Sequence, residues 1–189
     1  MSPASRSLAL LALAKLLLHL TTSRGYGFFR DEFYYLACSE HLALGYVDHP
    51  PLSIALLWLS RAILGDSLLA IRFLPALAGA ATVFTTGIIA RELGGRRSAQ
   101  MLAALAAFIA PNFLAFNHFF SMNAFDLLFW VLLVYLAARM LSRDEPRLWL
   151  AFGAVAGLGL ENKVSVTFLA FGLVVGLLAT PQRRLLASH

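Results

Sequence analysis

Polar side chains that can transfer protons or bind phosphate gather in residues 30–51 of an otherwise apolar chain. This stretch holds Arg30, Asp31, Glu32, Tyr34, Tyr35, Glu40, His41, Tyr46, Asp48 and His49. Carboxylates in a partly apolar setting suit general-base catalysis or cation binding, because partial loss of hydration raises a carboxyl pKa towards neutrality. We therefore take residues 30–51 as the first candidate for a site of chemistry.

Two later segments carry polar residues of the same kind. One is the turn 117–123, which leads to Asp126, and the other is the triplet Glu161-Asn162-Lys163. A cation beside carboxylates can hold a phosphate, so Lys163 is of particular interest. Any one of these residues alone is more often a solvated loop charge. Their occurrence in three segments on one side of the chain's apolar runs favours a site.

The composition places the chain in the class of integral membrane proteins. Hydrophobic residues make up 60% of the sequence and charged residues only 13%, and the mean hydropathy is +0.76. The single Cys38 excludes a disulfide framework within the chain. The basic residues form short clusters between apolar runs, which is typical of a topology signal and argues against nucleic-acid binding.

The apolar runs predict an all-α polytopic transmembrane bundle of about six spans, since one span needs about 20 apolar residues. The first run, 8–22, has the short apolar core of a signal peptide, but Lys15 interrupts it and no small-residue cleavage site follows. We expect an uncleaved anchor in which Lys15 snorkels or faces protein. The further runs are 68–90, 98–116, 124–140, 148–160 and 164–180.

The segment 23–67 is expected to be a polar loop with two short helices. Asp31 is a plausible N-cap of the first helix, and residues 52–64 form a second, too short to span and better suited to the membrane surface. The positive-inside rule places the chain ends in the cytoplasm and this loop outside, because arginines are in excess on the side that holds the chain ends. Seven acids then lie outside: Asp31, Glu32, Glu40, Asp48, Asp66, Asp126 and Glu161.

Four motifs in this order resemble the GT-C glycosyltransferases that use lipid-linked sugars. They are DEFYY at 31–35, DHPPL at 48–52, SMNAFDLLFW at 121–130 and GLGLENK at 157–163. The chain is most similar to bacterial relatives of the dolichyl-phosphate-mannose protein mannosyltransferases, which include the aminoarabinose transferase acting on lipid A. The resemblance extends from about residue 27 to residue 180.

The resemblance implies a glycosyltransferase of the bacterial inner membrane with its catalytic loop facing the periplasm or exterior. It would move a sugar from a polyprenyl-phosphate donor to a lipid, glycan or protein acceptor. The implied catalytic residues are Asp31, Glu32 and Asp48, with Asp31 as the base or its acidic partner and Asp48-His49 as a second acidic and polar pair. Many relatives have an Asp at the start of the fourth span, and either Asn123 or Asp126 fills that place here.

Sugar transfer needs a carboxylate to take the acceptor's proton and cations to stabilise the leaving phosphate. Asp31 fits the first need, and Arg30, His49 and Lys163 are candidates for the second. Tyr34, Asn123 and Asp126 complete the expected substrate-binding set. A divalent metal between carboxylates is left open, because no His or Cys ligand spacing argues for it.

Two alternatives use the same residues differently. In a cation-coupled transporter segment the carboxylates would line an ion path, although transporters place such groups near the membrane midplane. In a non-catalytic membrane scaffold the charges would be dispensable. Residues 1–189 are expected to be the N-terminal part of a longer GT-C catalytic domain, with 23–67 as its first outward loop.

Overall fold

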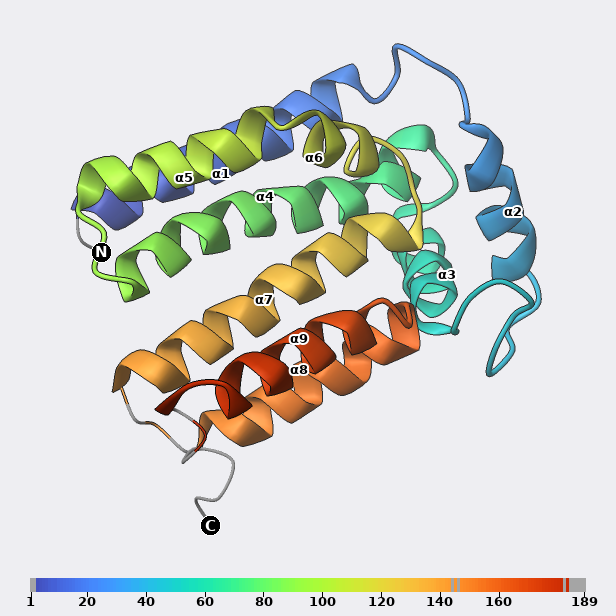
Figure 1. Ribbon diagram of the computed structural model, residues 1–189. Coiled ribbons are helices and arrows are strands. Elements are labelled where there is room, and N and C mark those ends of the chain that lie inside the picture. Colours follow the sequence, from blue (N-terminus) through green and yellow to red (C-terminus); the bar gives the residue numbers. More distant parts are fainter. Residues whose placement is uncertain (1–2, 144, 146, 182, 184–189) are drawn as a thin grey trace.

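A computed structural model describes residues 3–143, 145, 147–181 and 183, and every regular element within them is a helix (Figure 1). This confirms the predicted all-helical class. The helices are α1 (Pro3–Thr22), α2 (Arg30–Ser39), α3 (Leu52–Leu64), α4 (Leu68–Glu92), α5 (Arg97–Ile109), α6 (Pro111–Phe116), α7 (Met122–Arg143), α8 (Leu148–Asn162) and α9 (Val166–Leu178).

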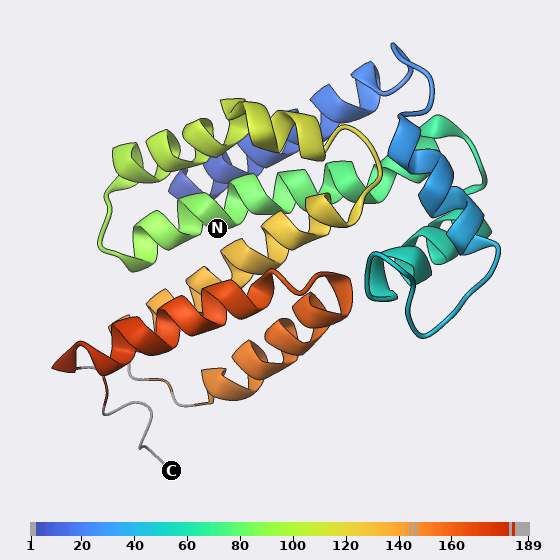
Figure 2. The ribbon, with the colours of Figure 1, turned by 45° about the vertical axis from the view of Figure 1, so that its right-hand side comes forward.

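The bundle consists of α1, α4, α5, α7, α8 and α9, which run side by side (Figures 1 and 2). Three of them, α1, α4 and α7, are long and apolar enough to cross a membrane unaided. The apolar helices α5, α8 and α9 have only 13 to 15 residues. The predicted set of about six spans therefore divides into three full-length helices and three shorter ones.

The predicted second short helix of the loop, 52–64, is present as α3 with the same bounds. Both α2 and α3 lie across one end of the bundle, which we call the α2–α3 end (Figure 2). The first turn of α7 and the connection between α8 and α9 lie at the same end. The fold thus brings together the three segments that the sequence singled out.

The predicted span 98–116 is broken between α5 and α6. Ala110 has an extended backbone, with φ −58° and ψ 127°, because the ring of Pro111 disfavours helical geometry in the residue before it. The break leaves the Phe108 carbonyl without a donor from its own helix, and Lys15 Nζ donates to it at 2.9 Å. Lys15 is fully buried and faces protein, as one of the two expected alternatives had it.

Two clusters of buried side chains hold the bundle together. One lies beneath α2 and α3 and contains Tyr35, Ile54, Leu57, Ile71, Ala78, Phe120 and Phe125. The other joins α1, α4 and α5 through Leu8, Val83, Ile88, Ala104 and Ala107. The first cluster connects the loop to the ends of α4 and α7, so it sets the position of α2 over the bundle.

Gly79 of α4 tests this packing. A Cβ at this position would lie 2.7 Å from Cγ and 2.9 Å from Cβ of the buried Asn117. We expect Gly79→Ala to destabilise the fold by about 1–3 kcal/mol, the usual cost of overpacking, and to lower the thermal midpoint in detergent. The matched variant is Gly153→Ala, because a Cβ at Gly153 meets nothing within 4 Å. Equal midpoints for the two variants would contradict the described approach of α4 to Asn117.

Candidate active site

Glu32 is fully buried and accepts four hydrogen bonds. Its Oε1 accepts from Arg72 Nε and from the Phe120 amide, each at 2.9 Å. Its Oε2 accepts from Arg72 Nη2 at 2.6 Å and from the Phe29 amide at 2.7 Å. The paired guanidinium and carboxylate form a bidentate contact, and both oxygens of Glu32 are occupied.

Arg72 also fixes the backbone that leads into α2. Its Nη1 donates to the carbonyls of Ser23 at 2.6 Å and Tyr26 at 3.3 Å, and its Nη2 donates to Gly27 at 2.7 Å. Arg72 lies in the second turn of α4 and is 2% exposed. Because a buried cation needs all of these acceptors, Arg72 holds the backbone between α1 and α2 in one conformation.

The start of α2 differs from the prediction. Asp31 is not the N-cap, because the helix begins at Arg30 and Phe29 takes the cap position. The carboxylate of Glu32, at the third position of the helix, accepts from the Phe29 amide, which is the half of a capping box that the N3 side chain supplies. Asp31 therefore lies in the first turn of α2. Its side chain is 43% exposed, and Arg30, itself 88% exposed, donates to it at 3.1 Å.

Asp31 and Asp48 both act on Tyr35, a buried residue of the next turn of α2. Burial raises the pKa of Tyr35, the Met122 amide that donates to its hydroxyl at 3.1 Å opposes this rise, and the charges of Asp31 and Asp48 add to it. Asp48 is exposed. The structure thus brings two of the predicted catalytic acids to the same part of α2, with Asp31 partly exposed and Asp48 open to solvent.

His49 is buried among three tyrosines. Its ring stacks on Tyr35 with 5.1 Å between centroids and an interplanar angle of 4°, and it lies against Tyr34 and Tyr46 at 5.7 Å and 5.3 Å. Nδ1 is 3.0 Å from the Pro50 carbonyl, so it must donate, and in the neutral ring Nε2 is then an acceptor without a partner among the described residues. His49 therefore orders the tyrosine side of the site.

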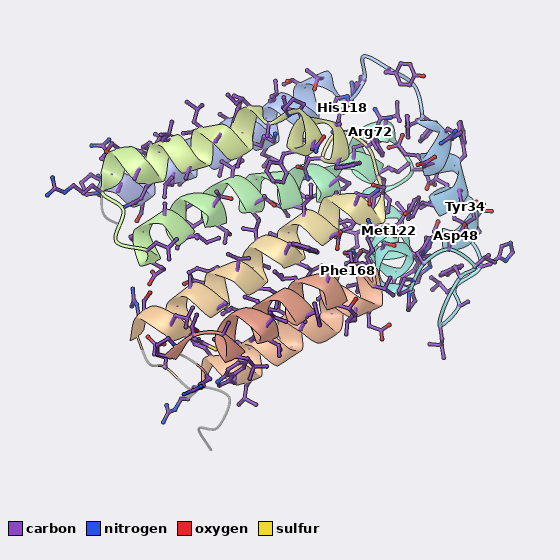
Figure 3. The ribbon with its side chains drawn as sticks, in the orientation of Figure 1. Tyr34, Asp48, Arg72, His118, Met122 and Phe168 are labelled. Atoms are coloured by element: carbon purple, nitrogen blue, oxygen red, sulfur yellow. The ribbon has the colours of Figure 1, made fainter. Side chains whose placement is uncertain are left out.

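Tyr34 lies on the exposed side of this group, near Asp48 (Figure 3). Loss of hydration raises the pKa of Tyr34 to about 12, with further contributions from Cys38 and Asp48. The Tyr34 hydroxyl therefore keeps its proton at neutral pH. It is available to donate a hydrogen bond to a sugar hydroxyl or a phosphate oxygen.

Lys163 contacts Asn123 and Asp126, two further residues of the predicted substrate-binding set. Its Nζ donates to Asn123 Oδ1 at 2.8 Å and lies 3.6 Å from Asp126 Oδ2. Asp126 Oδ1 accepts a short hydrogen bond from Ser165 Oγ, which accepts in turn from Trp130 Nε1 at 3.3 Å. The first three turns of α7 and the connection between α8 and α9 thus form one polar cluster, which we call the lysine cluster: Asn123, Asp126, Trp130, Lys163 and Ser165.

The backbone of one residue, Met122, connects α2 to the end of α8, next to Lys163. Met122 donates its amide to the Tyr35 hydroxyl at 3.1 Å and accepts from Asn162 Nδ2 through its carbonyl at 3.0 Å. Figure 3 shows Met122 between the ends of the bundle helices and the loop that carries Tyr34 and Asp48. The two predicted groups of site residues are therefore parts of one connected arrangement.

Sequence reasoning did not assign a site role to Arg72, Tyr35, Asn162 or Ser165. A signal existed for Arg72, because an arginine within the first turns of an apolar helix needs a buried partner. Nothing in the sequence pairs it with Glu32, which lies 40 positions earlier. Among residues 3–143, 145, 147–181 and 183, no three His, Cys, Asp or Glu side chains gather closely enough to hold a metal ion.

An apolar groove of about 830 Å³ runs between α4, α5 and α7. Its lining includes Ala103, Ala106 and Ala107 of α5 and Ala110 at the break after it, together with Asp126 and Trp130 of α7. Because Asp126 and Trp130 also belong to the lysine cluster, the groove begins at a polar end and continues along apolar side chains into the bundle.

Comparison with known proteins supplies the family. Residues 48–189 match the sequence profile described as dolichyl-phosphate-mannose-protein mannosyltransferase. The chain belongs to this family. The match to the mannosyltransferase family contains Asp48, His49 and the whole lysine cluster, and it begins after Asp31 and Glu32. No curated protein and no solved structure is significantly similar to the chain. Membership gives the general activity, a membrane glycosyltransferase, and agrees with the resemblance that the motifs indicate.

The buried pair of Glu32 and Arg72 yields a stability prediction. We expect Glu32→Gln to lower the free energy of unfolding by about 3–5 kcal/mol, because it leaves the Arg72 charge buried without a counter-charge. The control is Asp31→Asn, which removes the partner of an exposed arginine and should cost less than about 1 kcal/mol. Denaturant unfolding in detergent measures both. A Glu32→Gln variant as stable as the control would show that the pair does not fix the loop.

Proposed function

We propose that the protein transfers a sugar from a polyprenyl-phosphate donor to a lipid, glycan or protein acceptor at the α2–α3 end of the bundle. Family membership supports glycosyl transfer. The observation that supports the finer proposal is the lysine cluster, in which the Lys163 ammonium lies 3.6 Å from a carboxylate oxygen of Asp126, a residue that lines the apolar groove. A cation at the end of an apolar channel suits a substrate with a phosphate on a long hydrocarbon chain.

Asp31 is the proposed general base. The acceptor hydroxyl oxygen attacks the anomeric carbon, the bond from that carbon to the phosphate oxygen breaks, and the hydroxyl proton passes to the carboxylate. The leaving phosphate keeps the bonding electron pair, and a nearby cation stabilises its charge. Asp31 suits the base because it is partly exposed and paired only with an exposed arginine among the described residues. Asp48 is the second acid of the site.

Glu32 has a positioning role in this proposal. Its two oxygens already accept from Arg72, Phe29 and Phe120, so a substrate proton would have to displace an existing hydrogen bond. It holds the first turn of α2 against α4 and the turn before α7, and thereby sets where Asp31 points. Arg30, at 88% exposed, donates to Asp31 through Nε and has further N–H donors for the sugar or the phosphate.

The groove beside the lysine cluster is the proposed path of the polyprenyl chain. Along α7 it extends from Asp126 to Val134, which is about 12 Å of helix, roughly 40% of a hydrocarbon core of about 30 Å. The donor phosphate then lies near Lys163, at the end of the bundle that carries α2. We propose that this end faces the periplasm or exterior, in keeping with the excess of arginine at the opposite ends of the helices.

The test of the base is Asp31→Asn, which keeps the shape of the side chain and removes its charge. We expect transfer of radiolabelled sugar from a polyprenyl-phosphate donor to fall by about 10²–10⁴-fold, with normal insertion of the complete protein into membranes. Asp66→Asn is the matched control, since Asp66 is another exposed acid of the same loop, paired with Arg61. Full activity of Asp31→Asn would pass the role of base to Asp48.

The test of the cation compares two substitutions of Lys163. Lys163→Arg keeps the charge and should retain part of the donor binding, whereas Lys163→Gln should raise the donor KM about tenfold or abolish turnover. Because the same change leaves Asp126 without its cation, thermal unfolding is measured alongside. Unchanged KM and turnover in a folded Lys163→Gln variant would make Lys163 an interfacial anchor and place the phosphate elsewhere.

A further inference from the structure

A second groove lies at the α2–α3 end, away from the lysine cluster, between the last turns of α1 and the short α6. It has a volume of about 580 Å³ and is lined by Leu18, His19, Thr22, Pro111, Leu114, Ala115 and His118. Apart from Thr22 and the two histidines, the lining is apolar. The proposed transferase chemistry uses none of these residues.

His19 points to a ligand in this groove. The residue is 4% exposed, yet neither ring nitrogen has a hydrogen-bond partner among the described residues. Burying such polar atoms without partners costs free energy, which a native protein normally avoids by supplying a partner. His118 lies beside it, with 5.8 Å between ring centroids, and Figure 3 shows His118 at the same end of the bundle, close to Arg72. Two imidazoles therefore face one apolar groove.

The charges around the groove favour an anion. Lys15 lies one turn below His19 on the same face of α1 and is fully buried. Its ammonium donates to the Phe108 carbonyl, and none of the described acids pairs with it. The charges nearest His118 are Arg72 and Glu32, which neutralise each other. The uncompensated charge is thus positive, and its field is only weakly screened within a buried environment.

The geometry points to a binding site for an anionic phospholipid, with its phosphate at His19 and His118 and the start of its acyl chain along Leu18, Leu114 and Ala115. Each imidazole has one N–H to donate to a phosphate oxygen. The ammonium of the buried Lys15, one turn before His19 on α1, supplies positive charge that balances the phosphate. The last turn of a helix of spanning length lies at the level of the headgroups, which is where a phospholipid presents its phosphate.

The site differs from the proposed donor site in elements and residues. It is formed by α1, α6 and His118, whereas the lysine cluster belongs to α7 and to the connection between α8 and α9. His118 is nevertheless only two residues from Phe120, whose amide binds Glu32. A lipid in this groove would therefore also hold the turn that supports the loop.

The test is native mass spectrometry of the purified protein titrated with phosphatidylglycerol or phosphatidylcholine. We expect one site that prefers phosphatidylglycerol about tenfold, and an affinity about tenfold lower in His19→Leu and in His118→Leu, since each removes one charge-assisted hydrogen bond. His41→Leu, at an exposed histidine of the loop, is the matched control and should bind as the unaltered protein does. Equal affinity for the two lipids, or unchanged binding by the folded groove variants, would overturn the proposal.

A second measurement needs no substitution. Phosphatidylglycerol should slow the acylation of His118 by diethylpyrocarbonate and leave that of His41 unchanged, as read by peptide mass spectrometry. Equal rates at His118 with and without the lipid would reject the site even if a groove variant failed to fold. Protection by inorganic phosphate alone would show that the groove takes free phosphate, and would reject the assignment to a lipid.

Discussion

The bidentate contact between Glu32 and Arg72 is the interaction on which the rest of the site depends. It joins α2 to α4, and the further bonds of its two partners reach the connection after α1 and the turn before α7. A charged pair that is almost inaccessible to solvent is expensive to form unless every donor and acceptor is satisfied. Here the surrounding carbonyls and amides satisfy it, so the loop is held in a single arrangement and the neighbouring Asp31 remains accessible.

This arrangement separates two tasks between adjacent residues. Glu32 faces inward and holds the loop against the bundle, whereas Asp31 is partly exposed in the first turn of the same helix. In the sequence, nothing distinguishes the environments of the two adjacent acids that begin the DEFYY motif. Only the direction of each side chain from the helix makes them different, and that direction depends on Arg72, a residue in another element.

Much of the fold was predictable because the dominant signal, the apolar run, is local in sequence. The class, the bounds of α3 and the approximate positions of the bundle helices all follow from it. The break at Ala110 was also readable from Pro111, although the sequence interpretation treated 98–116 as one span. The start of α2 could not be predicted in this way. Its cap is completed by the carboxylate of Glu32, which lies inside the helix and is itself held by Arg72 of α4.

The candidate site, too, was predictable from the sequence only in part. The sequence singled out Lys163, Asn123 and Asp126 from their position at the ends of apolar runs, and the structure brings them into contact. It gave no indication of Ser165 and indicated Asn162 only as a member of the triplet 161–163, since small polar residues at helix ends are too common to carry a signal. Contacts between residues some 40 positions apart are set by how helices pack, which a single sequence does not reveal.

The backbone of Met122 has a mechanical consequence. Its N–H is bonded to the Tyr35 hydroxyl on α2 and its C=O to Asn162 at the end of α8. These two groups belong to successive peptide planes that share the Met122 Cα, so only φ and ψ of Met122 relate them, and the helical geometry of the first turn of α7 restrains both angles. A tilt of α2 towards an acceptor would therefore displace the start of α7 and pull on the residue next to Lys163. We expect a substrate that enters one half of the site to alter the fit of the other half.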